Sequence, residues 1–254
     1  MNPEPWTCRF ALTLIGLFLV MAVAIEAQTT GDPRYYDTGS PTLTDIWVDP
    51  VNGNDSNNGS TRGQALRTLA AAWNRIPSGT TLSGSGRRVM LTAGNYPESS
   101  IPNYLERRYG TAAFPIIFQS ADGRGSAVLQ GDLNIFDCRY LYLIDLTIRP
   151  VPAGDTLHFE QCSFILMRGL ELDGGLWTGE GQTTPVAHET LKINQCQYIY
   201  LEFGQFFQRR NSHKQIQILG VSSFDVMQNG NSPDENIIDL SIFEDGEKVL
   251  DGLD

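Results

Sequence analysis

Two segments of the chain carry polar residues at matching positions, where they could do chemistry together. The segments read LHFEQC and LKINQC, and the four polar side chains are His158, Glu160, Lys192 and Asn194. Because side chains alternate along a strand, all four point away from the apolar residues between them. Paired strands lie about 4.8 Å apart, so the four side chains would form one patch. A base beside a cationic group suits β-elimination, in which a proton next to a carboxylate is removed and the resulting charge is stabilised.

Both segments belong to a longer pattern that repeats along the chain. Its copies lie at 133–148, 157–172, 191–206 and, more loosely, 216–230. Each copy has two short alternating strands separated by a tight corner, and a Gly/Thr-rich insertion at 174–187 explains the longest spacing. Repeats of this length indicate stacked coils. We therefore predict an all-β chain folded as a parallel β-helix, in which each coil buries its inward residues against its neighbours.

One corner position holds a cysteine in three of the copies. The residues in this column are Cys138, Cys162, Cys196 and, in the fourth copy, Val221. Since a small apolar residue replaces the thiol in the last copy, we predict a buried ladder of free cysteines. A disulfide between neighbouring coils is a geometrically open alternative.

Aromatic residues form two outward columns in the second strands of the copies. The first column is Tyr140, Phe164 and Tyr198, and the second is Tyr142, Leu166 and Tyr200. Aromatic rings on a strand face can bind sugars, which makes the four tyrosines candidate substrate contacts. The alternative is that the rings stabilise neighbouring strands beneath a covering loop.

The first 27 residues have the order of a secretory signal peptide. Arg9 precedes an apolar run at 10–25, and small residues follow at the expected cleavage region. The run is shorter than the roughly 20 residues that a membrane-spanning helix needs. We therefore predict secretion to the extracellular space or cell wall without stable membrane insertion, a flexible linker at 28–45, and one domain at 46–254.

Acidic residues outnumber basic ones, 29 to 18, which gives a net charge of −11. Nucleic-acid binding depends on Lys and Arg neutralising phosphates, so this balance argues against it. An acidic polysaccharide would need a bridging cation to approach such a chain.

The beginning of the domain has its own signals. Ile46–Val48 is typical of a strand, and the Asn/Asp/Gly-rich loop at 49–60 indicates either turns or a Ca²⁺ loop. Apolar residues at helical spacing predict a helix at 64–76. We expect this helix to cover the open end of the coil stack.

These opening segments resemble a known group of proteins. WVDPVNGNDSNNGS, TLAAAWNRIP and VMLTAGNYPES are similar to the start of secreted right-handed parallel β-helix proteins of the pectate-lyase-like superfamily. The resemblance covers roughly 46–205, and the part after 205 departs from the pattern. The superfamily includes lyases, hydrolases and non-catalytic proteins, so the resemblance identifies the fold better than the reaction. Its members are usually longer, which suggests a truncated or alternatively spliced product.

The resemblance also implies roles for individual residues. In β-helix lyases a lysine or arginine is commonly the base and carboxylates hold Ca²⁺, which makes Lys192 the base candidate beside His158. Arg168 would neutralise a substrate carboxylate, with His188 and Asn194 as further substrate contacts. The calcium ligands would be Glu160, Asp173 and Glu189. The aspartate clusters of calcium-dependent lyases have no counterpart here, and a solvated face with scattered charge is the structural alternative.

We therefore expect a monomeric, secreted protein that acts on or binds a cell-wall or other extracellular polysaccharide, lyase-like in ancestry. A hydrolase is disfavoured, because the chain has no Asp-Asp pair. The alternative from another class is a non-catalytic carbohydrate-binding, adhesion or structural module, or an inactive fragment.

Overall fold

The computed structural model describes residues 36–149, 155–176, 189–202, 205–209, 214–219, 224–227 and 248–250. Residues from Thr38 onward form one compact unit, and only Tyr36 and Asp37 are described of the unit before it. The predicted signal peptide at 1–27 and His188 lie outside the described residues. Among the described residues, no helix is long and apolar enough to cross a membrane.

Most of the described chain lies in three sheets. The first sheet contains β1 (Leu43–Val48), β2 (Gly86–Leu91), β5 (Ile116–Ser120), β8 (Arg139–Ile144), β11 (Ser163–Arg168), β14 (Gln197–Glu202) and β17 (Phe224–Met227). The second contains β4 (Leu105–Glu106), β7 (Leu133–Phe136), β10 (Leu157–Glu160), β13 (Glu189–Asn194), β16 (Lys214–Leu219) and β18 (Lys248–Leu250). The third contains β3 (Gly94–Tyr96), β6 (Ala127–Gln130), β9 (Thr147–Arg149), β12 (Glu171–Leu176) and β15 (Gln205–Arg209).

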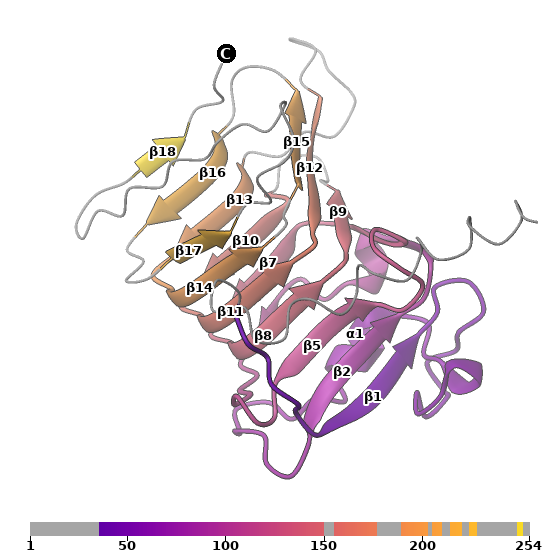
Figure 1. Cartoon of the computed structure of the whole chain (residues 1–254). Helices are drawn as coiled ribbons and strands as arrows, with labels where there is room; N and C mark the ends of the chain where they lie inside the picture. Colours follow the sequence, from indigo (N-terminus) through magenta and orange to yellow (C-terminus); the bar gives the residue numbers. More distant parts are fainter. Residues whose placement is uncertain are drawn as a thin grey trace, which may run out of the picture. The chain divides into compact units, whose positions relative to one another are not determined.

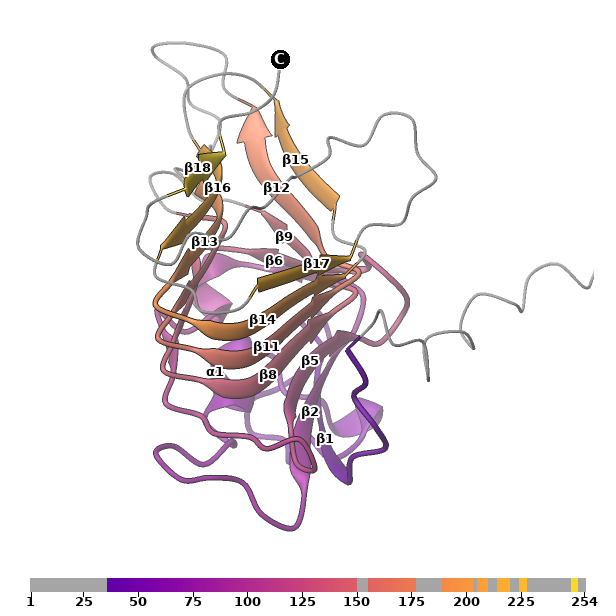
Figure 2. The same ribbon diagram turned by 60° about the vertical axis from the view of Figure 1, so that its left-hand side comes forward.

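The chain visits the three sheets in a fixed order. From β5 onward it passes through the first, the third and then the second sheet, and it repeats this circuit with β8, β9 and β10 and again with β11, β12 and β13. Neighbouring strands pair in parallel, apart from the antiparallel pair β16–β18. Figures 1 and 2 show the strands of successive circuits lying side by side. The arrangement is consistent with the predicted parallel β-helix.

The strand register agrees with the prediction from the alternating pattern. His158 pairs with Lys192 and Glu160 pairs with Asn194, while Phe159 pairs with Ile193 between them. Phe159 and Ile193 are fully buried, so the polar residues on either side of them lie on the outer face of the second sheet. The pattern of alternation therefore predicted both the inward and the outward residues of these coils.

The corner cysteines form the predicted buried ladder. Cys138, Cys162 and Cys196 are free thiols with almost no exposed surface. The backbone N–H of Cys138 donates to Cys162 Sγ at 3.4 Å, and that of Cys162 donates to Cys196 Sγ at 3.3 Å. Burial raises the pKa of Cys138 to about 12, so its thiol stays protonated and unreactive. The disulfide alternative is wrong for these three residues.

The predicted helix at 64–76 is shorter in the structure. A 3₁₀ turn, η1 (Arg62–Gln64), precedes α1 (Leu69–Trp73), and a second such turn, η2 (Glu98–Ser100), follows β3. Thr68 caps α1, because its side chain accepts a hydrogen bond from a backbone N–H in the first turn. The Asp55 carboxylate binds the N–H and hydroxyl of Thr68, which fixes an extended chain just before the helix. Leu69, Ala72 and Trp73 belong to the same buried core as the strands.

Side-chain oxygens fold the loop after β1 into a series of turns. The Asp49 carboxylate accepts hydrogen bonds from the backbone N–H groups of Val51 and Asn52, both at 2.9 Å. The side-chain oxygens of Asn54 and Asn58 likewise accept backbone N–H groups two residues further on. Carboxylate and amide oxygens that satisfy N–H groups in this way are typical of Asx-turns. The structure therefore favours the turn interpretation of residues 49–60.

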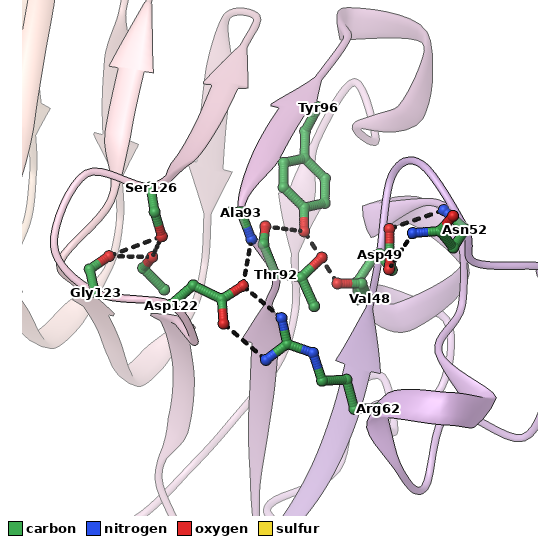
Figure 3. Close-up of polar contacts among 11 residues, drawn as sticks. Val48, Asp49, Asn52, Arg62, Thr92, Ala93, Tyr96, Asp122, Gly123 and Ser126 are labelled. Carbon is green, nitrogen blue, oxygen red and sulfur yellow. Dashed lines mark hydrogen bonds and ion pairs between the residues drawn. The ribbon is translucent and has the colours of Figure 1, made fainter.

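Side-chain contacts join the start of the domain to the following circuit, as Figure 3 shows. Both guanidinium nitrogens of Arg62 contact Asp122 at 2.7 Å, and the Ala93 N–H donates to the same carboxylate. The buried hydroxyl of Tyr96 lies 3.0 Å from the Val48 carbonyl. β1 itself begins at Leu43, so the last residues of the predicted linker belong to the first sheet.

Candidate functional site

The predicted polar patch lies on the outer face of the second sheet, with His158 at its centre. Asn194 Nδ2 lies 3.1 Å from His158 Nε2, and the Lys192 backbone is the direct neighbour of His158 on the adjacent strand. β7, β10 and β13, which supply this face, lie side by side in Figure 1. The structure therefore brings together four of the predicted site residues: His158, Lys192, Asn194 and Glu160, which pairs with Asn194.

Asp155 completes the cluster, and the sequence did not point to it. Its Oδ2 lies 3.6 Å from Lys192 Nζ and 3.8 Å from His158 Nδ1. Only 11% of the Asp155 side chain is exposed, against 16% for His158 and 26% for Lys192. Charged groups with so little exposed surface are costly unless they are paired. This burial argues against the interpretation of the patch as a solvated face with scattered charge.

Burial determines the protonation state of His158. Removal of the ring from water lowers the pKa of His158, Lys192 lowers it further, and Asp155 acts in the opposite direction. The imidazole is therefore neutral at neutral pH, since its ordinary pKa is already about 6.5. When the Asn194 amide donates to Nε2, the ring proton lies on Nδ1, facing Asp155. This arrangement gives a lone pair on Nε2, which a general base requires.

A second carboxyl group lies beside Asp155. Burial raises the pKa of Asp132, and the negative charge of Asp155 raises it further, while a hydrogen bond from Asn134 opposes both. Asp132 Oδ1 and Asn194 Oδ1 are buried and have no hydrogen-bond partner among the described residues. Unpartnered buried oxygens are costly, so each one calls for an explanation, such as a catalytic role or a bound ion or water.

Arg168 does not belong to this cluster. It lies on β11 in the first sheet, where its Nε donates to Glu202 at 2.6 Å. Glu202 is 1% exposed, and a carboxylate this deeply buried needs a positive partner. This ion pair corrects the prediction that Arg168 neutralises a substrate carboxylate beside Lys192.

The structure does not bring the predicted calcium ligands together. Asp173 lies on β12 in the third sheet and faces Arg149 at 3.9 Å. Glu160 pairs with Asn194, five residues beyond Glu189, so the two glutamate backbones lie roughly 16 Å apart. Within the described part of the chain, no group of three or more His, Cys, Asp or Glu residues could hold a metal.

The first aromatic column is a stack of rings. The ring centroids of Tyr140 and Phe164 lie 4.4 Å apart at 6°, and those of Phe164 and Tyr198 lie 4.6 Å apart at 13°. Neighbouring rings therefore cover both faces of Phe164 and the inner faces of Tyr140 and Tyr198, while Tyr198 keeps 43% of its surface exposed. All three residues have positive φ values, between 49° and 56°, and a left-handed backbone costs about 1–2 kcal/mol per residue. Stacking offsets part of this cost, which favours the stabilising role for Tyr140 and Tyr198.

The second aromatic column is mostly closed to ligands. Tyr142 is 1% exposed and Leu166 is fully buried, although the register places them with the partly exposed Tyr200 in one column. A buried ring cannot contact a polysaccharide. The prediction that Tyr142 binds substrate is corrected in favour of the alternative of a covered face.

No protein-family profile and no curated protein matches this chain. Among solved structures, a rhamnogalacturonan lyase matches with a TM-score of 0.40 and 11% identity over 74% of this chain and 64% of that chain. A GH136 lacto-N-biosidase from Eubacterium ramulus matches with a TM-score of 0.26 and 16% identity over 62% of this chain and 34% of its own. These likenesses are too distant to assign a function.

Proposed function

We propose that the chain coils as a secreted right-handed parallel β-helix and acts on an extracellular polysaccharide through the outer face of the second sheet. The repeated circuit through three parallel sheets supports the coil, and crossover connections between parallel strands are almost always right-handed. The cluster around His158 supports this location for the site, since it collects charged and polar groups from successive circuits on one outer face.

The proposed reaction is β-elimination on a uronic-acid polymer. The observation that carries it is the position of His158, whose Nε2 faces the Asn194 amide and which lies beside Lys192 on the adjacent strand. His158 Nε2 takes the proton next to the substrate carboxylate, after substrate displaces the Asn194 amide. The electron pair of that C–H bond forms a carbon–carbon double bond, and the bond to the neighbouring sugar oxygen breaks. The oxygen takes a proton from water, and protonated His158 returns its proton to the resulting hydroxide. Lys192 stabilises the charge that develops on the carboxylate.

This proposal exchanges the roles expected for the lysine and the histidine. Lys192 lies in an ion pair with Asp155, and an ammonium group has no lone pair with which to remove a proton. His158 has the lone pair, and Asp155 holds both side chains in place. Asp155 is therefore a positioning residue in the proposed site.

Calcium is part of the proposal as a bridging ion. The chain has a net charge of −11, and Asp132, Asp155 and Glu160 lie on or beside the proposed face. A divalent cation between such a face and a substrate carboxylate would reduce their repulsion. Elimination should then fall when a chelator is added and recover with Ca²⁺.

Substitution of His158 separates catalysis from binding. We expect His158→Ala to lower kcat by roughly 10²–10⁴-fold, the usual contribution of a general base, with polyuronate binding retained. Lys192→Ala should weaken both binding and turnover, because it removes a charge that the substrate contacts in both states. Gln197→Ala, at an exposed position of the first sheet, is the control. Undiminished turnover in His158→Ala would remove the histidine from the mechanism.

A non-catalytic polysaccharide-binding module is the second candidate. One observation favours it: Asp155 already neutralises Lys192, an arrangement that also suits a cluster that only stabilises the sheet. Such a module would bind polyuronates without forming any unsaturated product.

A further inference from the structure

An exposed aromatic residue precedes the short strand β4, at the edge of the candidate site. Leu105 of β4 pairs with Ile135 and is fully buried, and the next residue, Glu106, pairs with Phe136. Tyr104 directly precedes β4, and continuing the alternation by one residue would put it on the outer side of the sheet, next to Asn134. It is 58% exposed, so most of its ring is open to solvent.

Tyr104 therefore extends the column that contains the proposed catalytic groups. The register places Asn134 beside His158 and His158 beside Lys192. Strands are spaced about 4.8 Å apart, which puts the Tyr104 backbone roughly 14 Å from that of Lys192. A ligand lying along this column would contact the aromatic ring at one end and the charged cluster at the other.

Phe136 provides a second ring on the same face. It lies in the adjacent column between Glu106 and Glu160, and it is partly exposed. Among the described residues, neither Tyr104 nor Phe136 stacks on another ring or lies under a guanidinium group. Their ring faces differ in this respect from the stacked Tyr140–Phe164–Tyr198 column.

We infer that Tyr104 and Phe136 form a sugar-binding subsite that holds a polysaccharide beside the His158 cluster. The inference rests on the proposed function. It names a part of the site that positions the polysaccharide and does not cleave it. A sugar ring has an apolar face and a polar rim, and an aromatic ring next to an amide matches both. Asn134 supplies the amide, and the carboxylates of Glu106 and Glu160 flank Phe136 as hydrogen-bond acceptors.

The subsite predicts that affinity depends on the length of the saccharide. A short oligosaccharide bound at the His158 cluster would not reach Tyr104, whereas a longer one would cover both. Loss of one ring contact of about 1.5 kcal/mol corresponds to roughly tenfold weaker binding of long chains. Tyr104 is largely exposed, so its removal should change the free energy of unfolding by less than about 0.5 kcal/mol.

The test is calorimetric titration of a length series of oligouronates and of neutral oligosaccharides. The His158→Ala background prevents cleavage during the titration, and thermal unfolding confirms that each variant is folded. Adding Tyr104→Ala should weaken binding of long chains about tenfold and leave short chains unchanged. Tyr104→Phe keeps the ring and should bind within about twofold of the background protein.

The outcomes separate this inference from the proposed reaction. Equal affinity of long chains for the background protein and for Tyr104→Ala would overturn the subsite, whether or not elimination is found. Weaker binding in Tyr104→Ala, together with no unsaturated product from the protein with His158 intact, would support the subsite and reject elimination. Absence of binding to every saccharide would overturn both.

Discussion

At the scale of single residues, the proposed chemistry depends on a histidine that stays neutral. Burial and, to a smaller extent, Lys192 lower the pKa of His158, and the carboxylates of Asp155, Glu160 and Asp132 only partly oppose them. Asn194 orients the ring from the other side. A neutral imidazole next to an ammonium group combines a proton acceptor with a positive charge, which the proposed elimination requires at one place.

The lowered pKa of His158 determines how activity and stability depend on pH. Because the base works in its neutral form, kcat/KM should fall as the pH drops through a value below about 6.5, the ordinary pKa of histidine. The unfolded chain takes up the proton first, so the free energy of unfolding should decrease as the pH falls from about 6.5 towards the lower pKa of His158 in the folded protein.

An NMR titration of the three histidines measures the pKa directly. We expect one resonance, lost in His158→Gln, to titrate below about 6.5 in the folded protein and to move upward when Lys192 is replaced by methionine. A value for His158 at or above the ordinary pKa would contradict the assigned environment.

At the scale of single elements, the corners between sheets depend on stacked rings in a strained backbone. Phe164 has φ at 56° and lies between Tyr140 and Tyr198. The stacked ring stabilises the folded protein, whereas the left-handed backbone at this residue destabilises it. The two effects can be separated, because glycine tolerates positive φ and alanine does not.

Replacement of Phe164 therefore predicts an unusual order of stability. Phe164→Ala loses both ring contacts, about 0.5–1.5 kcal/mol each beyond the buried area, and keeps the strain. Phe164→Gly loses the same contacts but relieves about 1 kcal/mol of strain, so it should be the more stable of the two. Denaturant unfolding of both variants measures the difference. The reverse order, as found in an ordinary strand, would show that the backbone is not strained.

The element scale also shows what the sequence could predict. The cysteine ladder, the core residues and the pairing of His158 with Lys192 follow from short-range alternation and a repeated corner, so they were predicted. Asp155 was missed because it lies outside the repeated strand. It precedes β10 by two residues, whereas Asp132 precedes β7 by one, so the two aspartates do not align in the repeat. Tyr104 was missed because β4 has only two residues and no visible repeat. Residues outside the periodic strands are placed by loops, whose shape local alternation does not determine.

Arg168 shows a different limit of sequence reasoning. The sequence suggested that Arg168 meets a substrate carboxylate, but in the structure its partner is Glu202, 34 residues away. An ion pair between neighbouring circuits depends on which charges the stack brings together. Charge alone could not distinguish a substrate-binding arginine from one that neutralises a buried glutamate.

At the scale of the whole molecule, repeated circuits bring distant residues onto one face. Asn134, His158 and Lys192 come from three successive circuits and share one column on the second sheet. Tyr104, just before β4, would extend this column by alternation. The account assigns sugar binding to one end of this column and proton transfer to the other. A long face of this kind suits a polymer better than a small molecule.

Ultraviolet absorbance during incubation with a panel of polyuronates, with and without Ca²⁺, tests the central claim most directly. Elimination leaves a conjugated double bond, so the account predicts rising absorbance with at least one polymer and little or none with His158→Ala. A flat trace across the panel, from protein shown to be folded, would contradict elimination and favour a polysaccharide-binding module.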